Sequence, residues 1–147
     1  MKSARPGNTV FVLSRRSLPA VLLACSGLVL AGCGSVGDRS RSAGDVAVRL
    51  LTAVADSDGA TACALLAPDT AEAVAGAGDK PCAQAVLDEK LPGPGAVTGT
   101  DVYGQWAQVR LTGDTVFLAV FPGGWRVVAA GCTPRPERPY TCVLRGS

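Results

Sequence analysis

The side chains that could do chemistry in this chain are its cysteines and carboxylates. The 147 residues include six Cys, twelve Asp and Glu, and no His. Without His, the chain cannot build Ser-His-Asp or Cys-His catalysis, a His-ligated metal site or the usual proton shuttle at neutral pH. An enzyme made from this sequence would have to use carboxylates, Tyr, Lys, Arg or Cys.

One carboxylate has a potential partner at strand spacing. Asp101 and Tyr103 are two residues apart in a segment that resembles a strand, so both side chains would lie on one face. Such a pair could abstract a proton and return it. We favour the alternative, in which Asp101 is solvated and Tyr103 is a half-buried core residue.

Cys33 follows a segment with the three zones of a secretory signal peptide. Residues 1–17 are mostly polar and basic, residues 18–30 are almost wholly apolar, and the small residues Ala31 and Gly32 come next. The apolar run is shorter than the roughly twenty residues that cross a bilayer as a helix. The sequence therefore predicts a signal peptide over residues 1–32 and export of the rest.

The string Leu30-Ala31-Gly32-Cys33 resembles the lipobox of bacterial lipoproteins. The resemblance implies that the chain is cut before Cys33 and that a diacylglycerol is attached to its sulfur. Two acyl chains hold a protein stably on a membrane, whereas one chain binds reversibly. We therefore expect Cys33 to anchor the domain to the outer face of the cytoplasmic membrane. An ordinary signal peptide or an uncleaved signal anchor would also export it.

Two features of the leader leave alternatives open. Residues 14–18, Ser-Arg-Arg-Ser-Leu, resemble the twin-arginine export motif, but paired arginines also occur in general secretory signals. The basic region is long, so translation could begin at Val10 or Val12. Neither alternative changes the mature protein.

Residues 33–44 are expected to form a lipidated, flexible tether, because Gly34–Gly44 is rich in Gly and Ser and poor in apolar residues.

The leader carries four cations and no acids before Cys33, and the rest of the chain carries ten cations and twelve acids. No basic cluster interleaved with aromatic residues is present in the sequence, so we expect no nucleic-acid partner.

The remaining cysteines predict two disulfides. Cys25 lies in the leader and Cys33 is the expected lipid site, which leaves four cysteines in an exported domain. Three pairings are possible, and we favour the pairing of sequence neighbours, because each such pair lies within one region of the chain. A zinc site lacks the usual C-x-x-C spacing, and no cofactor is expected. The favoured pairs are Cys63–Cys82 and Cys132–Cys142.

Residues 45–147 are expected to form one α+β domain, with helices in its first half. Ser42 followed by Asp45 is typical of a capping box, and apolar residues then recur at helical spacing to about Ala55. Shorter helices are expected over residues 60–67, from Asp69 to Gly76, and from Asp79 through Leu87.

The second half has the pattern of a sheet. After LPGPG at residues 91–95, the sequence alternates and contains most of the aromatic residues. Helices followed by a run of strands predict helices packed on one face of a curved antiparallel sheet. The segment after Thr115 is apolar throughout, so this strand should be central. Strands are expected over residues 97–103, 106–111, 115–121, 125–130 and 140–144.

Four segments carry a further resemblance: VRLLTAVADSDGATACALLAPDTAEAV at 48–74, YGQWAQVRL, TVFLAVFPGGWRVVAAGC and PYTC. They are similar to small actinobacterial lipoproteins with a cone-shaped, cystatin-like domain of the nuclear-transport-factor-2-like superfamily. The resemblance implies a cavity between sheet and helices. Members include isomerases and dehydratases that use a carboxylate or His in the cavity, but this chain has no His.

Five aromatic residues are candidates for lining a ligand pocket, although aromatic residues in strands more often fill a core. A second candidate surface is the proline-rich loop with Arg135, Glu137 and Arg138, since a stiff loop loses little entropy on binding a protein. The aromatic candidates are Tyr103, Trp106, Phe117, Phe121 and Trp125.

These features together favour a non-enzymatic, lipid-anchored module that binds an envelope protein or a small apolar ligand. The first alternative is a cavity enzyme of the isomerase or hydratase type that uses Asp101. The second is a purely structural, accessory lipoprotein.

Overall fold

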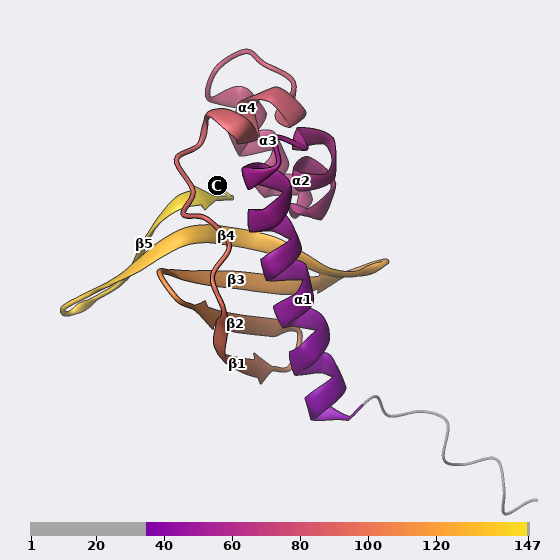
Figure 1. The fold of residues 1–147 in the computed structure, drawn as a ribbon, viewed down its shortest axis with the longest axis vertical. Coiled ribbons are helices and arrows are strands. Elements are labelled where there is room, and N and C mark those ends of the chain that lie inside the picture. Colours follow the sequence, from indigo (N-terminus) through magenta and orange to yellow (C-terminus); the bar gives the residue numbers. More distant parts are fainter. Residues whose placement is uncertain (1–34, 147) are drawn as a thin grey trace, which may run out of the picture. The chain divides into compact units, whose positions relative to one another are not determined.

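The structure is a computed structural model that describes residues 35–146. The predicted signal peptide and Cys33 lie outside the described residues. The described part is an α+β fold of four helices followed by a five-stranded antiparallel sheet, as the sequence predicts (Figure 1). The elements are α1 (Val36–Ala55), α2 (Gly59–Leu65), α3 (Pro68–Gly76), α4 (Cys82–Asp88), β1 (Val97–Tyr103), β2 (Trp106–Leu111), β3 (Asp114–Phe121), β4 (Gly124–Arg135) and β5 (Arg138–Arg145).

Helix α1 begins earlier than the sequence pattern predicts. Ser35 and Asp38 form a capping box, in which the Ser35 hydroxyl accepts a hydrogen bond from the Asp38 N–H at 3.1 Å. The Asp38 carboxylate accepts one from the Ser35 N–H at 3.3 Å. These bonds satisfy backbone donors that a helix start leaves free, so the helix begins at Val36 and not near Ser42.

The segment expected to be a flexible tether is therefore helical from Val36 onward. Its composition misled the prediction, because the small residues Ala43 and Gly44 are buried against the sheet and do not mark a loop. A β-carbon on Gly44 would lie 3.6 Å from the Thr100 hydroxyl on β1, so the helix backbone packs close to this strand.

The sheet is a meander with the order β1-β2-β3-β4-β5, and β3 is central as expected. On β2, Ala107, Val109 and Leu111 are buried, and Gln108 and Arg110 point to the other face. Helix α1 packs on the buried face and contacts β1 through β4, and the shorter helices gather beside β4 and β5 (Figure 1). We call the opposite face, which carries Asp101, Tyr103, Trp106, Gln108 and Arg110, the open face.

The core fills the layer between α1 and the sheet. Its largest fully buried apolar side chains come from α1, from α4 and from β2 through β5, so every central strand contributes to one cluster. Beside β4, Leu66 forms a parallel bridge with Val127, and the Ala67 N–H donates to the Val127 carbonyl at 2.8 Å. The largest core residues include Leu50, Leu51, Leu118, Leu144, Val109, Val116 and Val127.

Both disulfides have the predicted pairing. Cys63–Cys82 joins α2 to α4, and Cys132–Cys142 joins β4 to β5 at positions directly opposite in the register. Closing loops of this kind stabilises a fold by about 2–3 kcal/mol each in the loop-entropy model. Such a contribution is large for a domain with so small a core.

Strands β4 and β5 are longer than predicted, since their pairing continues to Arg135 and Arg138. The prolines in this hairpin argued for a loop. However, β3 pairs with β4 only as far as Ala129, so the far half of β4 has one free edge where Pro134 is tolerated. The register shifts between Thr133 and Arg135, at this proline.

Helix α4 begins at Cys82, later than the expected start at Asp79. Asp79 has a φ of 52°, a left-handed conformation that does not continue a helix.

Within residues 35–146, no helix has both the length and the apolar composition needed to cross a membrane.

Candidate functional site

The main concave site is a groove along α1. Two adjoining pockets of about 540 Å³ and 490 Å³ share Ser42, Gly124 and Trp125. They lie between α1 and two turns at one end of the sheet, the β1–β2 turn with Gly104 and the β3–β4 turn with Gly123. Helix α2 also lines the second pocket. We call this combined site the α1 groove. Each pocket has the size of a small-molecule site.

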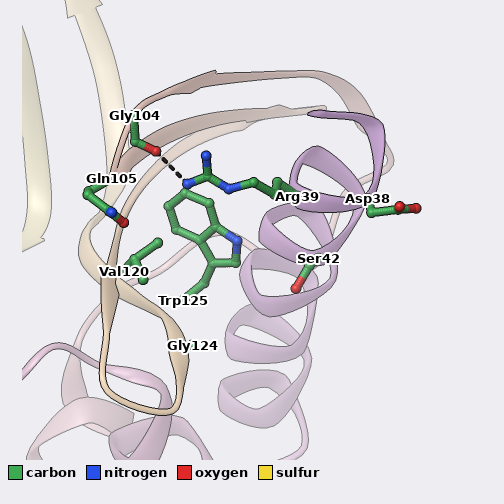
Figure 2. A pocket seen from close by; sticks show the side chains of 8 residues that line it. All are labelled: Asp38, Arg39, Ser42, Gly104, Gln105, Val120, Gly124 and Trp125. Atoms are coloured by element: carbon green, nitrogen blue, oxygen red, sulfur yellow. Dashed lines mark hydrogen bonds between the residues drawn. The ribbon is translucent and has the colours of Figure 1, made fainter. Parts of the chain in front are cut away.

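Trp125 forms the floor of the groove, and Arg39 covers it. Trp125 lies near the start of β4, opposite Val120, and is only 8% exposed. The Arg39 guanidinium carbon lies 5.4 Å from the Trp125 ring centre, and its Nη2 donates to the Gly104 carbonyl (Figure 2). A cation over an aromatic face is attracted by the ring electrons. Arg39 is therefore held in place from two sides.

The β1–β2 turn is bonded to β3, and the β3–β4 turn contains glycine where the backbone requires it. The Val120 N–H donates to the Gln105 carbonyl at 2.9 Å, which joins β3 to the β1–β2 turn. Gly123 and Gly124 have φ values of 96° and 116°, which favour glycine over other residues. Because glycine has no side chain, this wall of the groove consists of backbone atoms.

Three arginines line the groove: Arg39, Arg49 and Arg126. Arg126 donates to the Ala64 carbonyl on α2. None of the three takes part in the ion pairs found among residues 35–146, which are Arg41–Asp38, Lys80–Asp88 and Arg110–Asp101. Their positive charge is therefore not neutralised by a carboxylate in direct contact.

Asp38 is the only carboxylate among the described residues that line the groove. It accepts hydrogen bonds from Ser35 and from Arg41, and these contacts hold the pKa of the Asp38 carboxyl below its usual value. Its carboxylate also points away from Trp125 (Figure 2). Asp38 is thus engaged outside the groove and leaves the arginines there unpaired.

Asp101 and Tyr103 share one face of β1, as their spacing predicts, but that face is the open face. Asp101 pairs with Gln108 in the register and forms an ion pair with Arg110. A β-carbon on Gly99 would lie 2.5 Å from Arg110 Nη2, so the absence of a side chain at Gly99 leaves room for this guanidinium. Neither Asp101 nor Tyr103 is among the residues that line the α1 groove.

The five aromatic candidates do not surround one cavity. Trp125 lies in the α1 groove, whereas Trp106 and Phe121 line a smaller pocket of about 250 Å³ beside α3. Phe117 makes an edge-to-face contact with Tyr140 at 4.9 Å. Tyr103 lies opposite Trp106, and these two side chains are 64% and 58% exposed on the open face.

The charged hairpin is the other surface that the sequence singled out. Arg135 and Glu137 are exposed near the β4–β5 turn, and the backbone of Arg135 pairs with that of Arg138. The hairpin is not part of the α1 groove.

No cluster of His, Cys, Asp or Glu with the spacing of a metal site occurs within residues 35–146.

Sequence reasoning missed Arg39, Arg49 and Arg126. Arg39 was assigned to the tether, and its carbonyl partner Gly104 is 65 residues away in sequence. The signal that could have placed Arg39 on a helix is the Ser35-x-x-Asp38 string, which is typical of a capping box. Nothing in the local pattern indicates which strand residue Arg39 would meet.

Comparison of the chain with protein family models, with curated proteins and with solved structures finds no match. The α+β class therefore rests on the structure itself. The assignment to the nuclear-transport-factor-2-like superfamily stays a prediction from the sequence resemblance.

Proposed function

We propose that this protein is a non-enzymatic binding module of the cell envelope, held by a lipidated Cys33 on the outer face of the cytoplasmic membrane. Its ligand site is the α1 groove, and its domain is a variant of the nuclear-transport-factor-2-like cone. The observation that carries the proposal is the Arg39 guanidinium, held over Trp125 at 5.4 Å and unpaired with any carboxylate in the described residues.

The chemistry of the groove supports binding over catalysis. Its polar side chains are guanidinium groups, the Gln105 amide and the hydroxyls of Ser42 and Thr61, and Asp38 is engaged by the capping box. A general base needs a free carboxylate, imidazole or amine within reach of the substrate. Fixed cations above an aromatic floor are instead suited to hold and orient a ligand.

The cavity-enzyme alternative with Asp101 has less support. The Asp101 carboxylate contacts Arg110, and both side chains are on the open face, where solvent screens their charges. Catalytic carboxylates usually occupy clefts in which burial or a like charge shifts their pKa. Trp106, which is also on the open face, lines a pocket with Phe121, and Asp101 does not line that pocket.

Site-specific cross-linking in intact cells tests the proposal. Ser42 lines both pockets of the groove and is exposed, so a photoreactive amino acid at this position should cross-link the bound ligand. The matched control places the same amino acid at Glu72, which is exposed on α3 outside the groove. The Ser42 product should disappear when Arg39→Gln is added and should be absent from the Glu72 control.

Two results would contradict the proposal. Identical products from positions 42 and 72 would mean that the groove has no ligand of its own. A Ser42 product that is unchanged by Arg39→Gln would mean that the guanidinium does not hold the ligand. Because the full chain is used in its own membrane, both results are informative even while the ligand is unidentified.

A further inference from the structure

We infer that the α1 groove binds the phosphate-bearing headgroup of an anionic membrane lipid, with the phosphate at the Arg39 end. This inference rests on the proposed function and adds the chemical class of the ligand. It follows from the charge of the groove, from the position of Arg39 on α1, and from the exposed side chain that precedes it.

The charge in the groove selects an anion. A guanidinium carries five N–H donors in a planar fork that matches phosphate oxygens. Arg39 uses one donor group for the Gly104 carbonyl and one face for Trp125, which leaves other N–H groups free. Arg126 on β4 adds a second guanidinium to the same groove. A neutral ligand would not neutralise the positive charge of these guanidinium groups.

The arginines at the two ends of the groove have different surroundings. Arg49 and Arg126 line the second pocket, which has no carboxylate among its lining residues. Arg49 also lines a neighbouring hollow with Asp56 and Asp58, whose carboxylates reduce the potential at that end. The Arg39 end contains only Asp38, which the Ser35 and Arg41 contacts engage. We place the phosphate at Arg39 because this is the arginine of the groove nearest to Cys33 in the chain, and the rest of the headgroup can extend along Ser42 and Trp125.

The proposed anchor keeps this end of the groove near the bilayer. Ser35 follows Cys33 by two residues, and two extended residues span at most about 7 Å. Arg39 lies about one helical turn further, which adds about 5 Å. The headgroup layer on each side of a bilayer is about 5–8 Å thick. A chain lipidated at Cys33 thus carries Arg39 to the depth of lipid phosphates or just above it.

Val36 supports contact with the membrane at the same place. This residue begins α1 and is 73% exposed, which is the highest value among the exposed large apolar side chains of the described residues. The free energy falls when lipid covers an apolar side chain that is otherwise exposed to water.

Native mass spectrometry of the mature, lipidated chain tests this inference. The protein is purified in a non-ionic detergent and mixed with dihexanoyl phosphatidylglycerol or with dihexanoyl phosphatidylcholine at equal concentrations. We expect about tenfold stronger retention of the anionic lipid. Arg39→Gln should lower this retention about tenfold, because one charge-assisted hydrogen-bonding group is lost. Arg135→Gln, an exposed arginine on the β4–β5 hairpin, should leave it unchanged.

The outcomes separate the possible ligands. Equal retention of the two lipids, or equal losses in Arg39→Gln and Arg135→Gln, would overturn the inference. Displacement of the lipid by an equal concentration of inorganic phosphate would identify free phosphate as the ligand and would also overturn it. A chain whose Cys33 is lipidated but which retains no anionic lipid contradicts the inference alone. A chain without the lipid at Cys33 contradicts the proposed function.

Discussion

Arg39 connects the two layers of the fold through a single side chain. It extends from the first turns of α1 to the Gly104 carbonyl on the β1–β2 turn and covers Trp125 from β4. Three segments that are distant in sequence thus meet at one guanidinium. Such a position favours a residue that binds a ligand, because its geometry is set before the ligand arrives.

Asp101→Asn separates a binding module from a cavity enzyme. The Asp101–Arg110 ion pair lies on the open face, and exposed pairs contribute little to stability. We expect the midpoint of urea unfolding to change little, and the Ser42 cross-link to form as before. Loss of a catalytic activity in a folded Asp101→Asn variant would contradict the proposed function.

Asp114 gives a prediction about pH. This residue is 7% exposed, and its carboxylate accepts backbone hydrogen bonds from Gly131 at 3.2 Å and Cys132 at 2.8 Å. Burial raises the pKa of Asp114 in the folded protein, although these hydrogen bonds lower it in part. The folded state therefore binds this proton more tightly than the unfolded state, and acidification through this pKa adds stability.

Asp114→Asn should destabilise the domain by about 1–2 kcal/mol at neutral pH, because the amide cannot accept both backbone hydrogen bonds. The variant has no carboxyl group at this position, so its stability does not increase through protonation there on acidification. Its deficit should therefore widen as the pH falls from the raised pKa toward the usual value near 3.9. Urea unfolding of both proteins at several pH values measures the difference. A deficit that shrinks on acidification would contradict the assigned pKa direction.

At the scale of elements, close backbone contacts and one disulfide hold the short helices α2 and α4 in place. Gly59 begins α2 and is buried against α4, where an added β-carbon would lie 1.8 Å from the Ala83 carbonyl oxygen. The same two helices are joined by Cys63–Cys82. A helix of seven residues is not stable alone, so its position depends on this packing.

Gly59→Ala should destabilise the domain by about 2–3 kcal/mol, because the backbone of α4 has to move. The matched control is Gly76→Ala at the end of α3, where an added β-carbon meets nothing within 4 Å. This control should be neutral or should stabilise the domain by about 0.5 kcal/mol through helix propensity. Thermal unfolding followed by circular dichroism compares the two. Equal effects would show that α2 and α4 do not pack as described.

The sequence predicts elements best where local chemistry defines both ends. The bounds of β1 and β2 were predicted correctly, because alternation and the turn at Gly104 delimit them. The start of α1 was predicted too late, because Ala43 and Gly44 resemble a linker until the sheet that buries them is known. The α1 groove was not predictable, since Arg39 finds its partners only through the tertiary fold.

At the scale of the whole molecule, the proposed membrane anchor and the α1 groove are close together in the chain. The leader and the lipobox-like string predict attachment at Cys33, and α1 begins three residues later. Because α1 begins three residues after Cys33, the proposed anchor would hold the α1 groove near the membrane surface. In the proposed arrangement, the arginines of the groove would meet an envelope ligand at this surface.

The most direct test of the proposed anchor is the intact mass of the protein extracted from the membrane fraction. We predict a chain that begins at Cys33 and carries a diacylglyceryl group, with both disulfides intact. Cys33→Ser is the matched control and should remain uncut and without lipid. A mature chain that begins at any other residue, or an unmodified Cys33, would contradict the central claim.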